Sequence, residues 1–147
     1  MKYVHTNIIS RNWRKLAQFY IDVFDCTPVP PERKLSGEWL ERGTGLQGAE
    51  LQGAHLRLPG YGNKGPTLEI FQYKKHKRGI NPAVNRPGFT HIAFRVVDMK
   101  ETLQKVISSG GKALGKIVTK EIEGTGTISF VYTTDPEGNI IEIQKWE

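Results

Sequence analysis

The sequence predicts an α+β fold in which one unit, a strand, a helix and then three strands, occurs twice along the chain. The first observation is that residues 3–9 and 89–96 both read as short strands that contain a histidine, and that an apolar pattern of helical spacing follows each of them. The second observation is that each half closes on a short strand with a glutamate between aliphatic residues, at residues 67–71 and 140–144. A unit of this size cannot bury its sheet alone, so the two are expected to pair.

The length and the charge fit one domain made of these two halves. A chain of 147 residues has the usual size of a single domain, so we expect a first module at residues 1–73, a linker at 74–88 and a second module at 89–147. The net charge of +6 arises almost entirely in the linker, whose basic residues are Lys74, Lys75, Lys77, Arg78 and Arg86. We interpret the linker as a solvated connector, or alternatively as a lip that attracts an anionic substrate. Nucleic acid is not an expected partner, because its binders more often spread basic residues along a helix or a stacking sheet.

Two helices are predicted from apolar spacing and from their end signals. The first covers about residues 11–24, and the second begins after Asp98, with Glu101 three positions later as in a capping box. The second helix is expected to end at Gly110, because glycine readily adopts the left-handed conformation that terminates many helices. The apolar stripes are Trp13, Leu16, Phe19, Tyr20, Val23 and Phe24 in the first helix, and Met99, Leu103, Val106 and Ile107 in the second.

The remaining segments are predicted as strands. Residues 46–58 form a long segment interrupted by glycine, which is typical of a bent or bulged strand, and residues 112–120 and 127–134 give two more strands. Residues 31–42 are expected to hold a further strand. Residues 135–139, Asp-Pro-Glu-Gly-Asn, predict a tight turn, because proline fixes φ and glycine or asparagine accepts a positive φ.

The composition excludes several classes of protein. Cys26 is the one cysteine, so an internal disulfide and a zinc cluster of thiolates are excluded, and its apolar neighbours predict a buried, inert thiol. Residues 1–15 carry charges and no apolar core of a signal peptide. Uninterrupted apolar stretches of about 18 residues are absent, so we expect a cytoplasmic protein without a membrane partner.

Strand periodicity singles out four residues as candidate metal ligands. Alternate side chains of a strand point to opposite faces, so His5, Glu69, His91 and Glu142 each lie opposite the aliphatic row of their own strand. Each glutamate alone would pass as an ordinary solvent-facing residue of an antiparallel sheet. Glutamate is a poor strand former, however, and the order His-Glu-His-Glu at equivalent positions of two repeats favours metal binding.

Two imidazoles and two carboxylates suit a divalent cation such as nickel, zinc, cobalt, manganese or iron. Four ligands on a six-coordinate ion leave two positions, which two adjacent oxygens of a substrate would fill. Charge that develops on an enolate or enediolate oxygen would then lie directly against the cation. A carboxylate that detaches from the ion would be able to remove a proton next to a carbonyl group.

These segments resemble the glyoxalase, bleomycin-resistance and dioxygenase family, also called the vicinal oxygen chelate superfamily. The resemblance covers nearly the whole chain, and its motifs are Val4-His5-Thr6-Asn7, Leu68-Glu69-Ile70, Thr90-His91-Ile92-Ala93-Phe94 and Asp135-Pro136-Glu137-Gly138-Asn139 with Glu142. It implies paired βαβββ modules whose mixed sheets form a half-open cup around one metal ion, often in a homodimer.

Within the family the sequence is most similar to the glyoxalase I (lactoylglutathione lyase) branch. That likeness implies a metal-dependent lyase or isomerase with His5, Glu69, His91 and Glu142 as ligands and with Glu69 or Glu142 as the proton carrier. The implied substrate is a small molecule, either anionic or a thiol adduct. By strand phase, Asn7, Phe71, Tyr73 and Arg95 are candidates to line its binding site.

Two alternatives remain open at this point. A methylmalonyl-CoA epimerase stabilises an enolate on the same scaffold, although it usually has glutamine where Glu69 stands. A bleomycin-resistance type of protein binds a small molecule in the same cup without a metal ion. His55 and His76 fall outside the repeat, so each is expected to be a surface or loop histidine and not a ligand.

Overall fold

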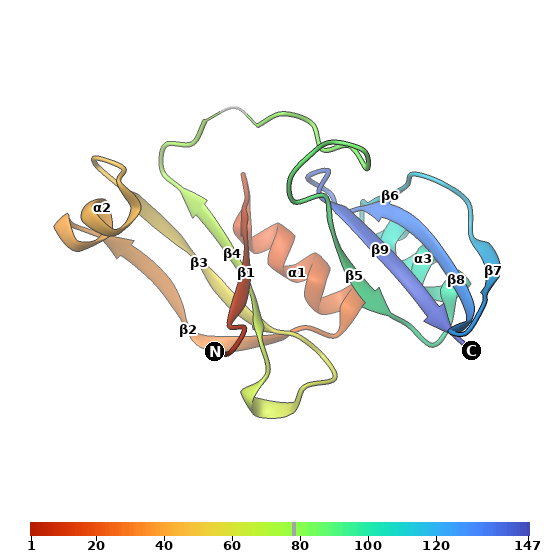
Figure 1. Ribbon diagram of the computed structural model, residues 1–147. Coiled ribbons are helices and arrows are strands. Elements are labelled where there is room, and N and C mark those ends of the chain that lie inside the picture. The colour runs from red at the N-terminus through yellow and green to blue at the C-terminus, as the bar shows by residue number, and fades with distance from the viewer. Residues whose placement is uncertain (78) are drawn as a thin grey trace. The chain divides into compact units, whose positions relative to one another are not determined.

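A computed structural model describes residues 1–77 and 79–147 (Figure 1). The chain divides into two compact units, Met1–Gly79 and Ile80–Glu147. The division falls inside the expected linker, and Arg78, which contributes to the linker's charge, lies outside the described residues. Within the described part of the chain, every helix is too short or too polar to traverse a lipid bilayer.

The first unit contains a four-stranded mixed sheet with helix α1 packed against it (Figure 1). In the sheet the strands follow the order β1-β4-β3-β2, and β1 runs parallel to β4 while the other neighbours are antiparallel. The elements are β1 (His5–Ile9), α1 (Trp13–Phe24), β2 (Thr27–Ser36), α2 (Glu38–Thr44), β3 (Glu50–Arg57), the 3-10 helix η1 (Gly62–Lys64) and β4 (Thr67–Tyr73).

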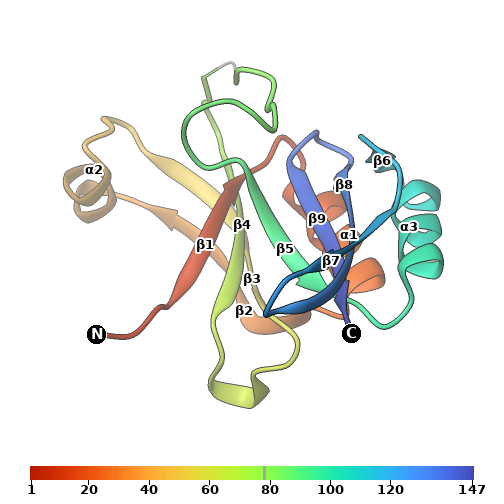
Figure 2. The same ribbon diagram turned by 45° about the vertical axis from the view of Figure 1, so that its right-hand side comes forward.

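The second unit repeats this plan, which confirms the predicted α+β fold of strand–helix–three-strand units. Strand β5 runs parallel to β9, and the sheet order is β5-β9-β8-β6, with β7 also paired to β8 (Figure 2). The elements are β5 (His91–Arg95), α3 (Met99–Ser108), β6 (Lys112–Ala113), β7 (Val118–Ile122), β8 (Gly126–Thr134) and β9 (Ile140–Trp146).

Helix α1 begins and ends where local signals place it. The side chain of Asn12 accepts a hydrogen bond of 3.1 Å from the backbone N–H of Lys15, and Asp25 adopts a left-handed conformation with φ of 54° at the other end. The buried residues of α1 include the whole predicted stripe. The helix packs on β3 and β4, whose buried aliphatic residues are Leu56, Leu68 and Ile70.

Helix α3 confirms the start and the stop predicted for it. The side chain of Asp98 accepts a hydrogen bond of 2.9 Å from the backbone N–H of Glu101, and Gly110 has a φ of 93° just after the helix. The helix packs on β8 and β9 and buries Met99 and Val106. Each unit therefore covers one face of its sheet with a helix.

The strand expected at residues 31–42 is only partly correct. Strand β2 begins earlier, at Thr27, and contains three prolines, which an edge strand tolerates because some of its N–H groups need no ladder partner. After Ser36 the chain forms the short helix α2 instead of continuing as a strand. Leu40 of α2 is buried in a cluster with Ala49, Leu51 and Phe71, and this contact is what favours the helix.

Two other strands are shorter than expected. Residues 46–49 form a turn in place of the first part of the strand predicted at 46–58, because Gly45 and Gly48 take positive φ values of 68° and 67°. The strand predicted at residues 112–120 is split into β6 and β7. Residues 114–117 stand opposite only Val131 and Tyr132 of β8, so the extra residues bulge out of the ladder.

The predicted turn at residues 135–139 is present. Asp135 is buried, and its Oδ1 accepts hydrogen bonds from the backbone N–H groups of Glu137 (2.9 Å) and Asn139 (3.0 Å). Its Oδ2 accepts a bond of 2.7 Å from the side-chain amide of Asn139, and Gly138 has the expected positive φ of 93°. This turn sets the start of β9, the strand that carries Glu142.

Cys26 lies two residues after the end of α1 and is buried, as expected. Burial, with a smaller contribution from the charge of Asp25, raises the pKa of its thiol to about 12. The thiol is therefore neutral near pH 7 and inert as a nucleophile.

Candidate functional site

The two units place a histidine and a glutamate at equivalent positions of their parallel strand pairs. In the first unit His5 stands opposite Thr67, two residues before Glu69 on β4. In the second unit His91 stands opposite Ile140, two residues before Glu142 on β9. The histidine and glutamate of each unit are therefore diagonal neighbours on one face of the sheet.

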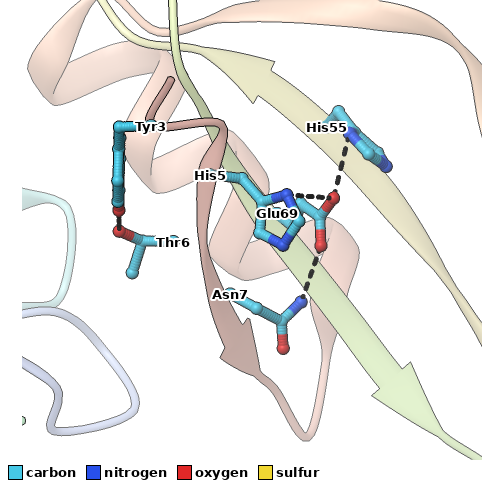
Figure 3. A network of polar contacts seen from close by, with 6 residues as sticks. All are labelled: Tyr3, His5, Thr6, Asn7, His55 and Glu69. Carbon is cyan, nitrogen blue, oxygen red and sulfur yellow. Dashed lines mark hydrogen bonds and ion pairs between the residues drawn. The ribbon is translucent and has the colours of Figure 1, made fainter. Parts of the chain in front are cut away.

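In the first unit three polar side chains surround the carboxylate of Glu69 (Figure 3). Nδ1 of His5 and Nδ1 of His55 each lie 3.3 Å from its Oε1. The side-chain amide of Asn7 donates a hydrogen bond of 3.4 Å to Oε2. Only 10% of the Glu69 side chain is exposed, so these groups replace most of the water that a free carboxylate would bind.

In the second unit the carboxylate of Glu142 has one polar side-chain contact within the described residues. Nε2 of His91 lies 3.1 Å from Oε2 of Glu142. The other ring nitrogen, Nδ1, is 3.0 Å from the hydroxyl oxygen of Thr90. The ring of Tyr132 meets the His91 ring edge to face, with centroids 5.1 Å apart, so the imidazole is held both by a hydrogen bond and by packing.

Burial shifts the pKa of two groups at these pairs. Desolvation lowers the pKa of His55, and the opposing attraction of the Glu69 carboxylate only partly offsets it. Desolvation also raises the pKa of the Tyr132 phenol, with a further contribution from the charge of Glu142. Both groups are therefore neutral near pH 7.

Each pair has the donor types and the spacing of two neighbouring ligands of one metal ion. Nitrogen and oxygen donors bind zinc at about 2.0–2.2 Å, so two adjacent ligands lie about 3 Å apart. The separations of 3.3 Å for His5 and Glu69 and 3.1 Å for His91 and Glu142 agree with this. Across residues 1–77 and 79–147, no group of three or more His, Cys, Asp or Glu side chains is arranged to hold a metal ion. That all four residues bind one ion therefore stays a prediction.

The residues expected to line a substrate site have different surroundings. Asn7 is exposed and contacts Glu69, as described above. Phe71 is buried in the cluster with Leu40, and Tyr73 packs against the same cluster. The guanidinium of Arg95 is exposed and donates a hydrogen bond of 3.1 Å to the carbonyl oxygen of Trp146. Asn7 is thus the one of these residues that lies against a predicted ligand.

The expectation that His55 is a surface or loop residue is wrong, because His55 is half-buried on strand β3. It lies on β3 directly opposite Glu69 on β4, and the two residues are at equal distances in sequence from Gly62 in the connecting loop. Pairing β3 with β4 symmetrically about that loop would have predicted the contact of His55 with Glu69. Comparison of the two repeats does not predict it, because the second unit has Tyr132 at the equivalent position of β8. His76 is exposed in the linker, as expected.

Comparison with known proteins supports the resemblance seen in the sequence. The sequence model of the Glyoxalase/Bleomycin resistance protein/Dioxygenase superfamily matches residues 2–143. A probable lactoylglutathione lyase of Synechocystis sp. is 29% identical over 140 residues, which cover 95% of this chain and 92% of that protein.

Solved structures show the same fold. A glyoxalase family protein from Bacillus cereus is similar with a TM-score of 0.76 at 19% identity, over 99% of this chain and 93% of that one. A variant of the fosfomycin resistance protein FosX from Listeria monocytogenes is similar with a TM-score of 0.59 at 12% identity, over 97% of this chain and 90% of that one. The FosX structure contains Mn(II) and 1S,2S-dihydroxypropylphosphonic acid.

Proposed function

The chain belongs to the Glyoxalase/Bleomycin resistance protein/Dioxygenase superfamily, and on that premise we propose that it is a divalent-metal-dependent lyase or isomerase that removes a proton next to a carbonyl group. The observation that carries the proposal is the repeated histidine–glutamate contact, which pairs His5 with Glu69 and His91 with Glu142. Both pairs sit at the same register of equivalent strands, and neither is needed to bury the aliphatic face of its sheet.

The proposed metal ligands are His5, Glu69, His91 and Glu142, and the ion is nickel, zinc, cobalt, manganese or iron. Two carboxylates neutralise a divalent charge, and their low exposure favours an ion over bulk water as their partner. When bound, the cation would supply positive charge close to the substrate oxygen on which negative charge develops. The FosX structure with Mn(II) is a precedent for a metal ion on this fold.

Glu142 is the better candidate for the group that accepts the substrate proton. A carboxylate acting as base has to turn toward the carbon acid, and each hydrogen bond that fixes it opposes this turn. Glu69 contacts His5, His55 and Asn7, whereas Glu142 contacts only His91 among the polar side chains of the described residues. We therefore assign Glu69 as the fixed ligand and Glu142 as the movable one.

The proposed substrate is a hemithioacetal formed by an α-ketoaldehyde and a thiol such as glutathione. This choice is supported by the 29% identity to a protein named as a probable lactoylglutathione lyase. It is also supported by the chemistry of the site. In such a hemithioacetal the carbon that carries the hydroxyl group is bonded to the carbonyl carbon, so its C–H bond is acidic and a carboxylate can remove the proton.

The test measures thioester formation from methylglyoxal and glutathione by protein loaded with each of the five metals in turn. The Glu142→Gln variant is expected to lose about 10²–10⁴-fold in kcat, the usual contribution of a general base. The exposed His76 provides the control, and His76→Gln is expected to retain full activity.

Activity that survives in Glu142→Gln would contradict the assignment of the base. Absence of thioester formation with all five metals would contradict the proposed substrate. If the protein also failed to bind any of the metals, a non-catalytic binding protein would become the better description.

A further inference from the structure

Three neighbouring strands of the first unit place Asn7, Glu69 and His55 in one row across the sheet. Asn7 on β1 is directly opposite Glu69 on β4, and Glu69 is directly opposite His55 on β3. Directly opposite residues project from the same face with their Cβ atoms about 4.5–5.5 Å apart. The backbone register alone therefore determines the order Asn7, Glu69, His55 across the sheet, whatever rotamers these side chains adopt.

The side chains of this row hold both oxygens of the carboxylate (Figure 3). His55 approaches Oε1 through Nδ1 at 3.3 Å, from the side opposite to β1 in the row. Asn7 donates to Oε2 at 3.4 Å. Strand β3 contacts Oε1 through His55, and strand β1 contacts Oε1 through His5 and Oε2 through Asn7. Rotation of the carboxylate about its terminal bond is therefore restricted from both sides. This is the arrangement by which outer residues orient a metal ligand.

The His55 ring is itself fixed by packing. Its centroid lies 5.6 Å from that of Phe71, and the two rings meet edge to face with an angle of 68° between their planes. Phe71 follows Glu69 by two residues on the same face of β4 and is buried with Leu40 and Leu51. The core cluster beneath α2 thus supports the imidazole, and the imidazole supports the carboxylate.

The second unit uses the same strand position differently. Tyr132 of β8 stands opposite Glu142, just as His55 of β3 stands opposite Glu69. Its ring packs on His91. The repeat therefore keeps a ring at this strand position in both units, and of these two rings only that of His55 directs a nitrogen atom at the neighbouring carboxylate.

We propose that His55 is a positioning residue that holds the Glu69 carboxylate in the orientation in which Glu69 binds the metal ion. The proposal rests on the proposed function, because it takes Glu69 as a ligand. His55 acts through Glu69 and contacts neither substrate nor the reacting atoms in this scheme. Loss of such an outer partner typically weakens metal affinity by about 10–100-fold.

The experiment compares wild type with His55→Phe, His55→Asn and the control His76→Phe. Phenylalanine keeps a ring against Phe71 but removes both nitrogen atoms, whereas asparagine places an amide at the distance from Cβ where Nδ1 of histidine lies. The dissociation constants for Zn²⁺ and Mn²⁺ are measured by competition with a chromogenic chelator, and urea unfolding of each variant checks that it is folded.

We expect His55→Phe to bind both ions about 10–100-fold more weakly than wild type, His55→Asn to recover much of that loss, and His76→Phe to match wild type. Equal affinities in His55→Phe and wild type would overturn the positioning role and leave the metal site standing. Equal losses in His55→Phe and His55→Asn would overturn it in favour of simple packing. A wild type that binds neither ion would overturn the positioning role and the proposed metal dependence together.

Discussion

Replacement of Asp135 by alanine tests how far one buried carboxylate stabilises the turn that leads into β9. Asp135 is 2% exposed, and its side-chain carboxylate accepts two hydrogen bonds from backbone N–H groups and one from the Asn139 side-chain amide. At about 1 kcal/mol of net stability for each bond, Asp135→Ala is expected to lower the free energy of unfolding by about 3 kcal/mol. For a chain of this length the corresponding fall in Tm is about 6–12 °C.

The assay is urea unfolding followed by circular dichroism, with a thermal scan as a second measurement. Glu123→Ala is the matched control, because Glu123 is exposed in the turn between β7 and β8, and its free energy of unfolding is expected to stay within about 0.5 kcal/mol of wild type. An Asp135→Ala protein that differs from wild type by less than about 1 kcal/mol would refute the reasoning, because it would show that the freed donors find other partners at little cost.

Three further predictions concern the strand pairing, the thiol and a helix start. Gly53→Ala is expected to destabilise the protein by about 1–3 kcal/mol in urea unfolding, because a Cβ atom there would lie 2.1 Å from the carbonyl oxygen of Ile70. The control is Gly43→Ala in α2, where a Cβ atom meets nothing within 4 Å, so this variant is expected to be neutral or stabilising. Equal effects of the two substitutions would contradict the close approach of β3 and β4. Cys26 is expected to react with a chromogenic disulfide reagent at pH 8 only after unfolding, because burial raises the pKa of its thiol to about 12; rapid reaction of the folded protein would contradict this. The hydrogen bond from the Glu101 backbone lowers the pKa of Asp98 in the folded state, so its contribution to stability is present near pH 7 and is lost as the pH falls through that lowered pKa; the difference in stability between wild type and Asp98→Ala should therefore shrink in acid, and a difference independent of pH would argue against it.

The repeat and its two main helices could be predicted because local signals determine them. The apolar stripe of α1 and the cap at Asp98 each lie within one helix, and the structure confirms both. The turn after β8 is likewise determined by its own residues, since the Asp135 side chain accepts hydrogen bonds from the backbone N–H groups of Glu137 and Asn139 in the same motif. Sequence order alone is enough for features of this kind.

The part of the first unit around α2 could not be predicted in the same way. The helix is seven residues long, too short for an apolar period to be recognised, and it depends on the contact of Leu40 with Leu51 and Phe71. Those partners come from later strands, so only the tertiary fold brings them to the helix. Local strand signals in residues 31–42 were therefore overridden by packing.

The candidate site shows the same division between local and distant information. The repeat marks the strands and the phase of His5, Glu69, His91 and Glu142, which singles them out as candidates, and the structure shows the contacts of His5 with Glu69 and of His91 with Glu142. The contact of His55 with Glu69 could not be predicted from the repeat, because it depends on the register of β3 against β4. That register is set by the length of the loop between β3 and β4, and comparison of the two repeats gives no information on this length.

The measurement that tests the central claim most directly is the metal content of protein purified without chelator and then saturated with each candidate ion. We expect about one ion per chain in wild type, a clear loss in Glu69→Gln and in Glu142→Gln, and an unchanged value in the exposed control Glu123→Gln. A wild type without metal, two ions per chain, or full retention of metal in both Glu69→Gln and Glu142→Gln would contradict the claim that the two histidine–glutamate pairs bind one divalent ion.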